Sequence, residues 1–243
     1  MKLKAFYILL ISILSINTSM VFAQGETPTT FFLPPKNLSA FNFQYLNLTS
    51  NLTPSQDVAL AHGTIDINAY IIPLLYSFSI KGHIAQVLVT PTYGHMTGSV
   101  DIDNQLEYGN ISVPAGTEVE FIDKSGLFDP SVWLRVGLLN APALNIIDFS
   151  KLEPKFQLYG LAGFTAPLGE YDQSRRVNLG ANRWAFRLAT PMVIPLNKDK
   201  QHLASWEITP NIYFYTHNND PFTGDIKTQT PLFVLLQHLS KYF

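Results

Sequence analysis

Residues 204–216 read ASWEITPNIYFYT, and apolar and polar side chains alternate along this stretch with a period of two. The even positions carry Ala204, Trp206, Ile208, Pro210, Ile212, Phe214 and Thr216. The odd positions carry Ser205, Glu207, Thr209, Asn211, Tyr213 and Tyr215. Successive side chains of a β-strand point to opposite faces, so this stretch predicts a strand with one apolar face and one polar or amphipathic face.

Alternation of the same kind extends over much of the chain. It is regular at residues 65–71, 130–138, 157–168 and 183–194. Less regular candidates for strands lie at 41–48, 84–93, 106–113, 117–122 and 232–242. Turn-forming residues separate them, for example Lys81-Gly82 and the run at 218–221. The chain is therefore predicted to be all-β, with about ten strands.

The length of these strands favours a membrane barrel over a soluble sandwich. Several stretches run for 9 to 14 residues. A tilted strand needs about 9–11 residues to cross a bilayer, whereas strands of globular proteins average about 5–6. Aromatic residues lie near the ends of several of them, as at the two membrane interfaces of a barrel: Tyr93, Trp133, Tyr159, Trp184, Tyr215 and Tyr242. The prediction is an antiparallel up-and-down transmembrane β-barrel, and the alternative is that these aromatics pack a soluble core.

Composition supports that prediction. Charged residues make up 14% of the chain, against about a quarter in soluble domains, and aromatics reach 13%. No cluster of basic residues exists to bind a phosphate backbone, so nucleic acid is not an expected partner. Cysteine is absent, which excludes disulfides, thiol chemistry and Cys-based metal sites.

The N-terminus has the layout of a secretory signal. Lys2 and Lys4 precede an apolar run of 12 residues at 5–16, and small residues lead up to Ala23. Twelve residues rise only about 18 Å as a helix, which is too short to anchor in a membrane core of roughly 30 Å. We expect residues 1–23 to be a signal peptide cleaved after Ala23, and residues 24–243 to form a single barrel domain in the outer membrane of a Gram-negative bacterium.

Two features do not fit simple strands. Prolines fall within or near the predicted strands, and each removes a hydrogen-bond donor from the ladder: Pro73, Pro91, Pro191 and Pro210. Residues 141–149 (APALNIIDF) lie between two clear strands and predict a short helical turn outside the membrane.

Signatures of catalysis and of cofactor binding are missing from the sequence. The six histidines are scattered and form no paired ligand set. No nucleophile elbow, phosphate-binding loop or dinucleotide glycine pattern occurs. We therefore expect no catalytic residue, no cofactor and no metal, and a protein that is not an enzyme.

Four charged residues fall on the non-apolar parity of predicted strands: Arg135, Arg183, Arg187 and Glu207. Charges facing hydrocarbon are costly, so these four are candidate lumen-lining residues. Two interpretations stay open. They brace a narrow barrel through ion pairs, or they form a constriction that selects solutes.

A series of short motifs resembles one outer-membrane family. The motifs run in the family's order at residues 80–85 (IKGHIA), 125–130 (SGLFDP), 139–144 (LNAPAL), 166–171 (APLGEY), 177–186 (VNLGANRWAF), 217–220 (HNND), 229–232 (QTPL) and 238–240 (HLS). On these residues the chain resembles the “putative meta-pathway of phenol degradation” family, often labelled simply transporters. The resemblance covers residues 34–243, with Phe128 standing where the family's turn has a glycine.

The resemblance implies an outer-membrane barrel that passes small hydrophobic or aromatic molecules without chemistry. Its expected partners are outer-membrane lipid, the barrel assembly machinery and a solute that the sequence does not identify. Family members continue past the position of Phe243, to about 12 strands in a full-length relative. A shortened member and a natural end at Phe243, resembling the terminal phenylalanine of barrels, both remain open. Two other functions also remain: a structural or adhesive barrel without transport, and a soluble periplasmic barrel that binds a ligand.

Overall fold

The computed structural model describes residues 32, 34–52, 62–102, 106–108, 111–114, 117–175, 177–199, 202–222 and 224–241. The predicted signal peptide and Ala23 lie outside the described residues. Nearly all regular structure is β. The strands are β1 (Ser39–Phe41), β2 (Gln44–Leu52), β3 (His62–Ile71), β4 (Leu74–Ile80), β5 (His83–Thr90), β6 (Thr92–Ile102), β7 (Leu106–Tyr108), β8 (Ile111–Val113), β9 (Thr117–Leu127), β10 (Ser131–Leu139), β11 (Gln157–Thr165), β12 (Ala185–Ala189), β13 (Met192–Pro195), β14 (Ala204–Tyr215) and β15 (Leu232–Lys241).

Most strands continue one another across breaks of one to three residues, and together they make longer ribbons. The ribbons of the described chain, in order, are β1–β2, β3–β4, β5–β6, β9–β10, β11, β12–β13, β14 and β15. Each pairs antiparallel with the next ribbon along the chain, through β2–β3, β1–β4, β3–β6, β4–β5, β6–β9, β5–β10, β10–β11, β11–β12, β11–β13, β12–β14, β13–β14 and β14–β15. This is the up-and-down topology that the sequence predicts.

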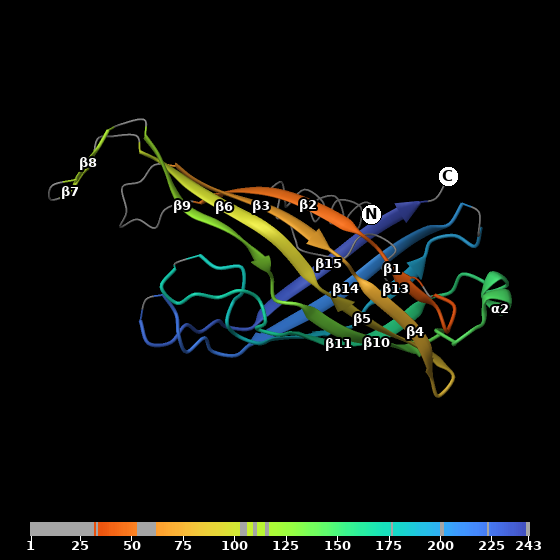
Figure 1. Cartoon of the computed structure of the whole chain (residues 1–243). Coiled ribbons are helices and arrows are strands. Elements are labelled where there is room, and N and C mark those ends of the chain that lie inside the picture. The colour runs from red at the N-terminus through yellow and green to blue at the C-terminus, as the bar shows by residue number, and fades with distance from the viewer. Residues whose placement is uncertain are drawn as a thin grey trace, which may run out of the picture.

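In the view of Figure 1, β14 and β15 slope the opposite way from β3, β6 and β9. The sheet β2-β3-β6-β9 extends toward one end, with the hairpin β7–β8 beyond its tip. The tight turn between β4 and β5 and the short helix α2 (Ile146–Ser150) lie at the other end. Among the described residues, no hydrogen-bonded pairing joins β15 to β1 or β2.

The ten predicted strands all overlap observed strands, but three of them are differently organised. Residues 106–113 form the hairpin of β7 and β8, and residues 117–122 and 130–138 belong to one ribbon, β9–β10. The helical turn predicted at 141–149 is α2, which begins after Asn145; the Asn145 side chain accepts a hydrogen bond from the backbone N–H of Asp148.

The prolines that contradict simple strands mark the breaks within ribbons. Pro73 separates β3 from β4, Pro91 separates β5 from β6, and Pro191 separates β12 from β13. Pro210 lies inside β14 beside the break in β12–β13, where its carbonyl accepts the N–H of Thr190 at 3.2 Å. Each missing donor therefore falls where the ladder is interrupted, in keeping with the usual place of proline in sheets.

The predicted alternation separates an outward from an inward face. Along β14, Ser205, Glu207, Thr209 and Asn211 are buried, while Trp206 and Phe214 are exposed on the opposite face. Along β10 and β12 the outward rows include Leu134, Leu138, Phe186 and Leu188, all exposed. The rows 204–216, 130–138 and 183–194 therefore face as the sequence indicates, with their apolar side chains outward.

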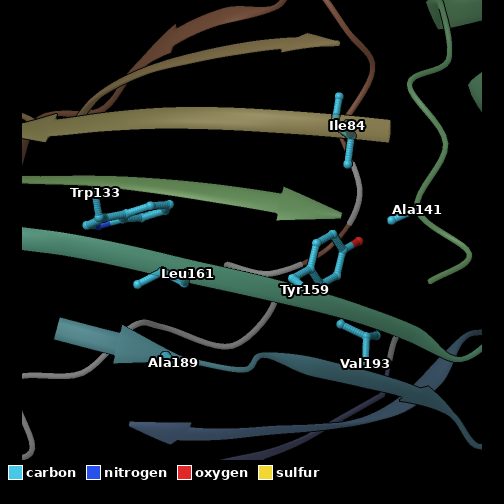
Figure 2. Close-up of a cluster of buried hydrophobic side chains, with 7 residues drawn as sticks. All are labelled: Ile84, Trp133, Ala141, Tyr159, Leu161, Ala189 and Val193. Carbon is cyan, nitrogen blue, oxygen red and sulfur yellow. The ribbon is translucent and has the colours of Figure 1, made fainter. Parts of the chain in front are cut away.

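The inward face also carries an apolar cluster (Figure 2), formed by Ile84, Trp133, Ala141, Tyr159, Leu161, Ala189 and Val193. These residues come from β5, β10, β11, β12 and β13, and one from the connection after β10. The register places Leu161 opposite both Arg135 and Ala189, which puts charged and apolar inward side chains on adjacent ribbons. Within the described ranges no helix is long and apolar enough to cross a membrane.

Candidate functional site

Arg135 is deeply buried on the inward face, with 1% of its surface exposed. Its guanidinium lies 4.6 Å from the centre of the Tyr159 ring, on the neighbouring strand β11. One terminal nitrogen also donates to the Phe32 carbonyl at 3.3 Å. The Tyr159 hydroxyl in turn donates to Oε1 of Gln157 at 2.8 Å. A weakly hydrated, planar cation over a ring face is a stable buried arrangement, so Arg135 is held in a fixed position.

Arg187 lies on the inward face of β12. Its Nε and Nη2 atoms donate to Oδ1 of Asn211 at 2.8 and 2.6 Å, and its guanidinium lies 5.7 Å from the centre of the Tyr213 ring. Asn211, on β14, donates onward to the carbonyl of Thr209 at 2.7 Å. The two strands β12 and β14 are thereby joined by side chains as well as by their ladder.

Arg183 and Glu207 occupy different levels of the same wall. Arg183 precedes β12, lies 4.8 Å over the Tyr215 ring and donates to Gln229 in the following connection. Glu207 is 1% exposed and lies between Val193 and His238 in the register of β13, β14 and β15. All four predicted charges are therefore on or next to the inward face, spread along it rather than gathered at one point.

The sequence predicts Trp133, Tyr159 and Tyr215 among the aromatics of the membrane interfaces. That prediction is wrong for Trp133 and Tyr159, which are buried in the inward cluster because they have the inward parity of their strands. Tyr213 is not part of that prediction. Tyr159, Tyr213 and Tyr215 each lie beneath one arginine, and each has the inward parity of its strand. The signal is present in the alternation itself, because a tyrosine on the polar face of a barrel strand has no lipid to contact and offers its ring to a cation.

A second part of the interior is the connection of residues 166–182, called here the plug loop. The carboxylate of Asp129 fastens both of its ends: Oδ1 accepts the N–H of Gly169 and Oδ2 accepts the N–H of Ala181, each at 2.7 Å. The N–H of Gly180 also donates to the carbonyl of Glu170 at 2.9 Å. A Cβ on Gly180 would lie 2.8 Å from the backbone carbon of Gly169, so this close meeting of the two ends requires glycine.

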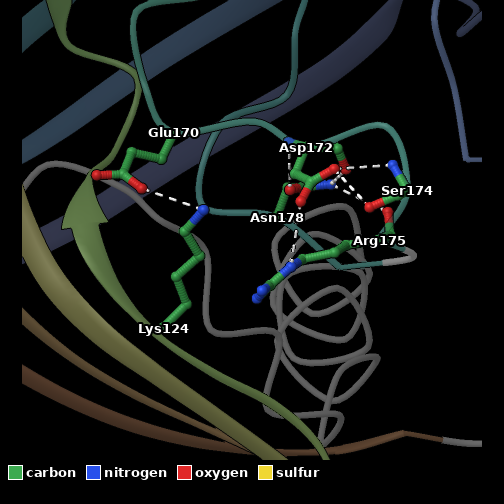
Figure 3. A network of polar contacts seen from close by, with 6 residues as sticks. All are labelled: Lys124, Glu170, Asp172, Ser174, Arg175 and Asn178. Carbon is green, nitrogen blue, oxygen red and sulfur yellow. Dashed lines mark hydrogen bonds and ion pairs between the residues drawn. The ribbon is translucent and has the colours of Figure 1, made fainter.

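The plug loop is held against the extended sheet by a polar network (Figure 3). Lys124 of β9 lies 3.1 Å from Glu170, and Arg175 lies 3.3 Å from Asp172. The Asp172 carboxylate accepts from the hydroxyl of Ser174 at 2.6 Å, and its backbone N–H donates to Asn178 at 2.8 Å. Hydrogen bonds from the hydroxyl and then the N–H of Ser174 lower the pKa of Asp172, and Arg175 adds to the effect.

Apolar contacts place the plug loop on the inward face. Leu179 packs with Met96 of β6 and Ile122 of β9, and Val177 and Ile67 join this cluster. At its far side Tyr171 donates to the carbonyl of Asp220 at 2.7 Å and accepts from Asn218 at 2.9 Å. The loop therefore bridges the sheet and the connection after β14. The sequence identifies 166–171 and 177–186 only as motifs of the family resemblance, without a fold for the loop.

A metal centre is not part of this interior. Among the described residues, no group of three or more histidine, aspartate or glutamate side chains is arranged to hold an ion. The chemistry that the interior offers is therefore ion pairing, hydrogen bonding and contact with aromatic rings.

Comparison with known proteins gives two matches. The model of the family described as “Putative MetA-pathway of phenol degradation” matches residues 67–229. Among solved structures, the fold is similar to that of an outer membrane channel from Pseudomonas putida F1, with a TM-score of 0.52 and 18% identity over 85% of this chain and 67% of that chain. No curated protein matches the chain.

Proposed function

Since the family model matches more than half of its length, the chain belongs to the family described as “Putative MetA-pathway of phenol degradation”, and we propose that it is an outer membrane channel for small hydrophobic or aromatic molecules. The observation that carries this proposal is the division of single strands into two faces. On β14 and β10, exposed apolar side chains alternate with buried Glu207 and Arg135. A wall with apolar side chains outside and charges inside suits lipid around it and polar passage within it.

The proposed mechanism is passive. Solute would move along the inward face past the arginine–tyrosine pairs of Arg187 and Arg183, which are only partly buried. The tyrosine rings offer apolar surface to an aromatic body, while the guanidinium groups favour a solute that carries negative charge or hydrogen-bond acceptors. No bond is made or broken, so the protein is proposed not to be an enzyme.

The lengths of the connections suggest an orientation. At one end, β4 and β5 are joined by two residues, Lys81 and Gly82, both at positive φ as a tight hairpin requires. The plug loop and the connection at 216–231 lie at the other end and are much longer. Short turns of outer-membrane barrels face the periplasm and long loops face outward. The plug loop would then lie on the outer side and α2 on the periplasmic side.

Export is proposed to follow the signal-peptide route. The mature protein would begin at Gln24, after cleavage behind Ala23, and would be inserted by the barrel assembly machinery. Sequencing the N-terminus of the membrane-extracted protein tests this proposal, and an intact Met1 would contradict it.

A second candidate is a structural barrel without transport. It is favoured by the filling of the inward face, where Tyr159 and Ile84 are buried together with Arg135 and Glu207. On this reading the charges only brace the wall.

Proteoliposomes distinguish the two. 4-Hydroxybenzoate, an aromatic anion that crosses lipid slowly, is trapped inside, and its release is followed with and without the protein. We expect faster release with the protein, whereas equal release would favour the structural barrel. Cell fractionation with gel mobility before and after boiling tests the soluble alternative, because a folded membrane barrel runs faster unboiled.

A further inference from the structure

A cavity of about 280 Å³ lies at the α2 end of the inward face, apart from the arginine–tyrosine pairs of Arg187 and Arg183. Its walls are mainly apolar, with Phe149 and Leu152 from the α2 segment facing Val193 of β13 and Leu203 before β14. Figure 2 shows Val193 at one end of the buried cluster, beside Tyr159. Two charged residues, Glu153 and Lys155, also line the cavity, and both are exposed.

Three neighbouring ribbons bring two polar side chains into this apolar surface. Gln157 of β11 pairs with Val193 of β13, and Ser205 of β14 pairs with Pro195 at the end of β13. Both Gln157 and Ser205 line the cavity, and both have the inward parity of their strands.

The hydroxyl of Ser205 is the strongest indication of a ligand. The residue has no exposed surface, and its Oγ has no hydrogen-bond partner among the described residues. A buried polar atom without a partner costs free energy, so such groups normally meet a partner in the functional state. Gln157 already accepts from Tyr159 through Oε1, which leaves its amide nitrogen as a donor. The Ser205 hydroxyl can therefore donate and accept a hydrogen bond to a ligand, and the Gln157 amide nitrogen can donate one.

We propose that this cavity binds a small molecule with a single apolar ring and one hydroxyl group, the hydroxyl meeting Ser205 and Gln157 and the ring lying against Phe149, Leu152, Val193 and Leu203. The volume is just below the range of about 300–1,000 Å³ typical of drug-sized ligands, which fits one ring rather than two. The proposal rests on the proposed channel function, in which the site would hold solute at the periplasmic mouth. It differs from the arginine–tyrosine pairs because it selects a neutral hydroxyl instead of a charge.

Two probes of nearly equal size test the hydroxyl requirement. 4-Fluorophenol and 4-fluorotoluene differ by a hydroxyl in place of a methyl group, and binding to the folded protein in micelles is followed by 19F NMR against empty micelles. We expect 4-fluorophenol to bind more tightly. Ser205→Ala should reduce this preference about 3- to 10-fold, as loss of one hydrogen bond does.

Ser240→Ala is the matched control. Ser240 pairs with Ser205 in the register of β14 and β15 and its Oγ also has no partner in the described chain, but Ser240 does not line the cavity. It should leave the preference unchanged. Leu203→Trp, which fills the cavity, should weaken the binding of both probes. It tests the site if Ser205→Ala does not fold. Equal binding of the two probes to wild type, or equal effects of the two serine variants, would overturn the proposal.

Release of 4-hydroxybenzoate from proteoliposomes, measured on the same preparations, separates this site from the channel function. Flux without hydroxyl-dependent binding would remove the site and leave the channel. Hydroxyl-dependent binding without flux would support the site and remove the channel.

Discussion

Replacing Asp129 with alanine should release the plug loop from the inward face. Asp129 is the one side chain in the described chain whose carboxylate accepts from both ends of this loop, through the N–H groups of Gly169 and Ala181. The middle of the loop has contacts of its own, among them the ion pair of Glu170 with Lys124 and the packing of Leu179 in the apolar cluster. Removing the carboxylate therefore acts first on the two ends of the loop.

The size of the effect follows from the two bonds. Hydrogen bonds to a charged group contribute about 1.5–3 kcal/mol each, and both bonds here are short at 2.7 Å. The bond to Ala181 is exposed, so we take about 2–4 kcal/mol for the pair. Since about 1.4 kcal/mol corresponds to a factor of ten, the loop should open roughly 30 to 1,000 times more often.

Amide hydrogen exchange of the folded protein measures this opening directly. Exchange at Gly169 and Ala181 should accelerate by that factor in Asp129→Ala, while amides in β14 stay protected. Planar-bilayer conductance should rise as well, because the loop covers part of the inward face. Asp123→Ala is the control. Asp123 lies on β9, whereas Asp129 lies in the break between β9 and β10, and the exposed carboxylate of Asp123 contacts His95 at 3.5 Å and no part of the plug loop among the described contacts. Unchanged exchange in Asp129→Ala would refute the fastening role, and faster exchange at constant conductance would refute the plug.

Three further predictions concern facing, selectivity and pH. Leu188→Arg places a charge on the outward face and should destabilise the barrel in bilayers by about 2–4 kcal/mol. The control Leu168→Arg, in the plug loop, should cost little. Equal urea midpoints of the two variants would mean that the faces are misassigned. The double variant Arg183→Gln with Arg187→Gln should shift the reversal potential of the channel toward cation selectivity. The control double variant Lys198→Gln with Lys227→Gln, at two exposed positions, should not shift it. If neither variant shifts the reversal potential while conductance is retained, these arginines only stabilise the wall. Because the pKa of Asp172 is lowered, its carboxylate stabilises the loop fully above the ordinary pKa of 3.8, and this stability is lost as the pH falls through the lowered pKa. The NMR signal of the Ser174 amide should therefore stay constant from pH 7 to 5 and move only in stronger acid. In Asp172→Asn that acid step should be absent.

Much of the wall could be predicted because alternation of side chains is a local property. The outward row of Phe186 and Leu188 and the inward position of Arg187 follow from parity alone, and the structure has both. The same holds for Leu134 and Arg135. Parity is fixed by backbone geometry, so no knowledge of distant contacts is needed.

The organisation of strands into ribbons was less accessible. The predicted strand 65–71 stopped before Pro73, and the predicted strand 84–93 ran through Pro91. Each proline only interrupts one ribbon, because the strands on either side keep the same neighbours: β3 and β4 both pair with the β5–β6 ribbon. Local sequence indicates that a donor is missing at a proline. It does not indicate whether the ladder resumes beyond it, since that depends on the partner strand.

The plug loop shows the limit of local reasoning at the site. The motifs at 166–171 and 177–186 were visible in the sequence, but Asp129 brings Gly169 and Ala181 together across 40 and 52 residues of sequence. Nothing within 166–182 itself names Asp129 as the partner. The arginines could be found from the sequence because each is a charged residue within its own otherwise mostly apolar strand, so no distant partner had to be known.

The facing of β3 shows why alternation must be read together with position along the barrel. Ile65 and Ile67 oppose Asp66 and Asn68, a pattern of the same kind as in β14. Here, however, the isoleucines pack inward with Leu179 of the plug loop, and the outward Asn68 accepts from the hydroxyl of Tyr45 at 2.5 Å. A polar outer face and an apolar inner face fit a part of the wall that stands in water and covers a folded loop, just as the reverse fits a part that stands in lipid. The apolar side chains therefore change from the outward to the inward face along the ribbon, near the exposed Tyr70 and Tyr93. In the proposed channel this change would mark the point where the wall leaves the membrane, and the plug loop covers the apolar inner face beyond it.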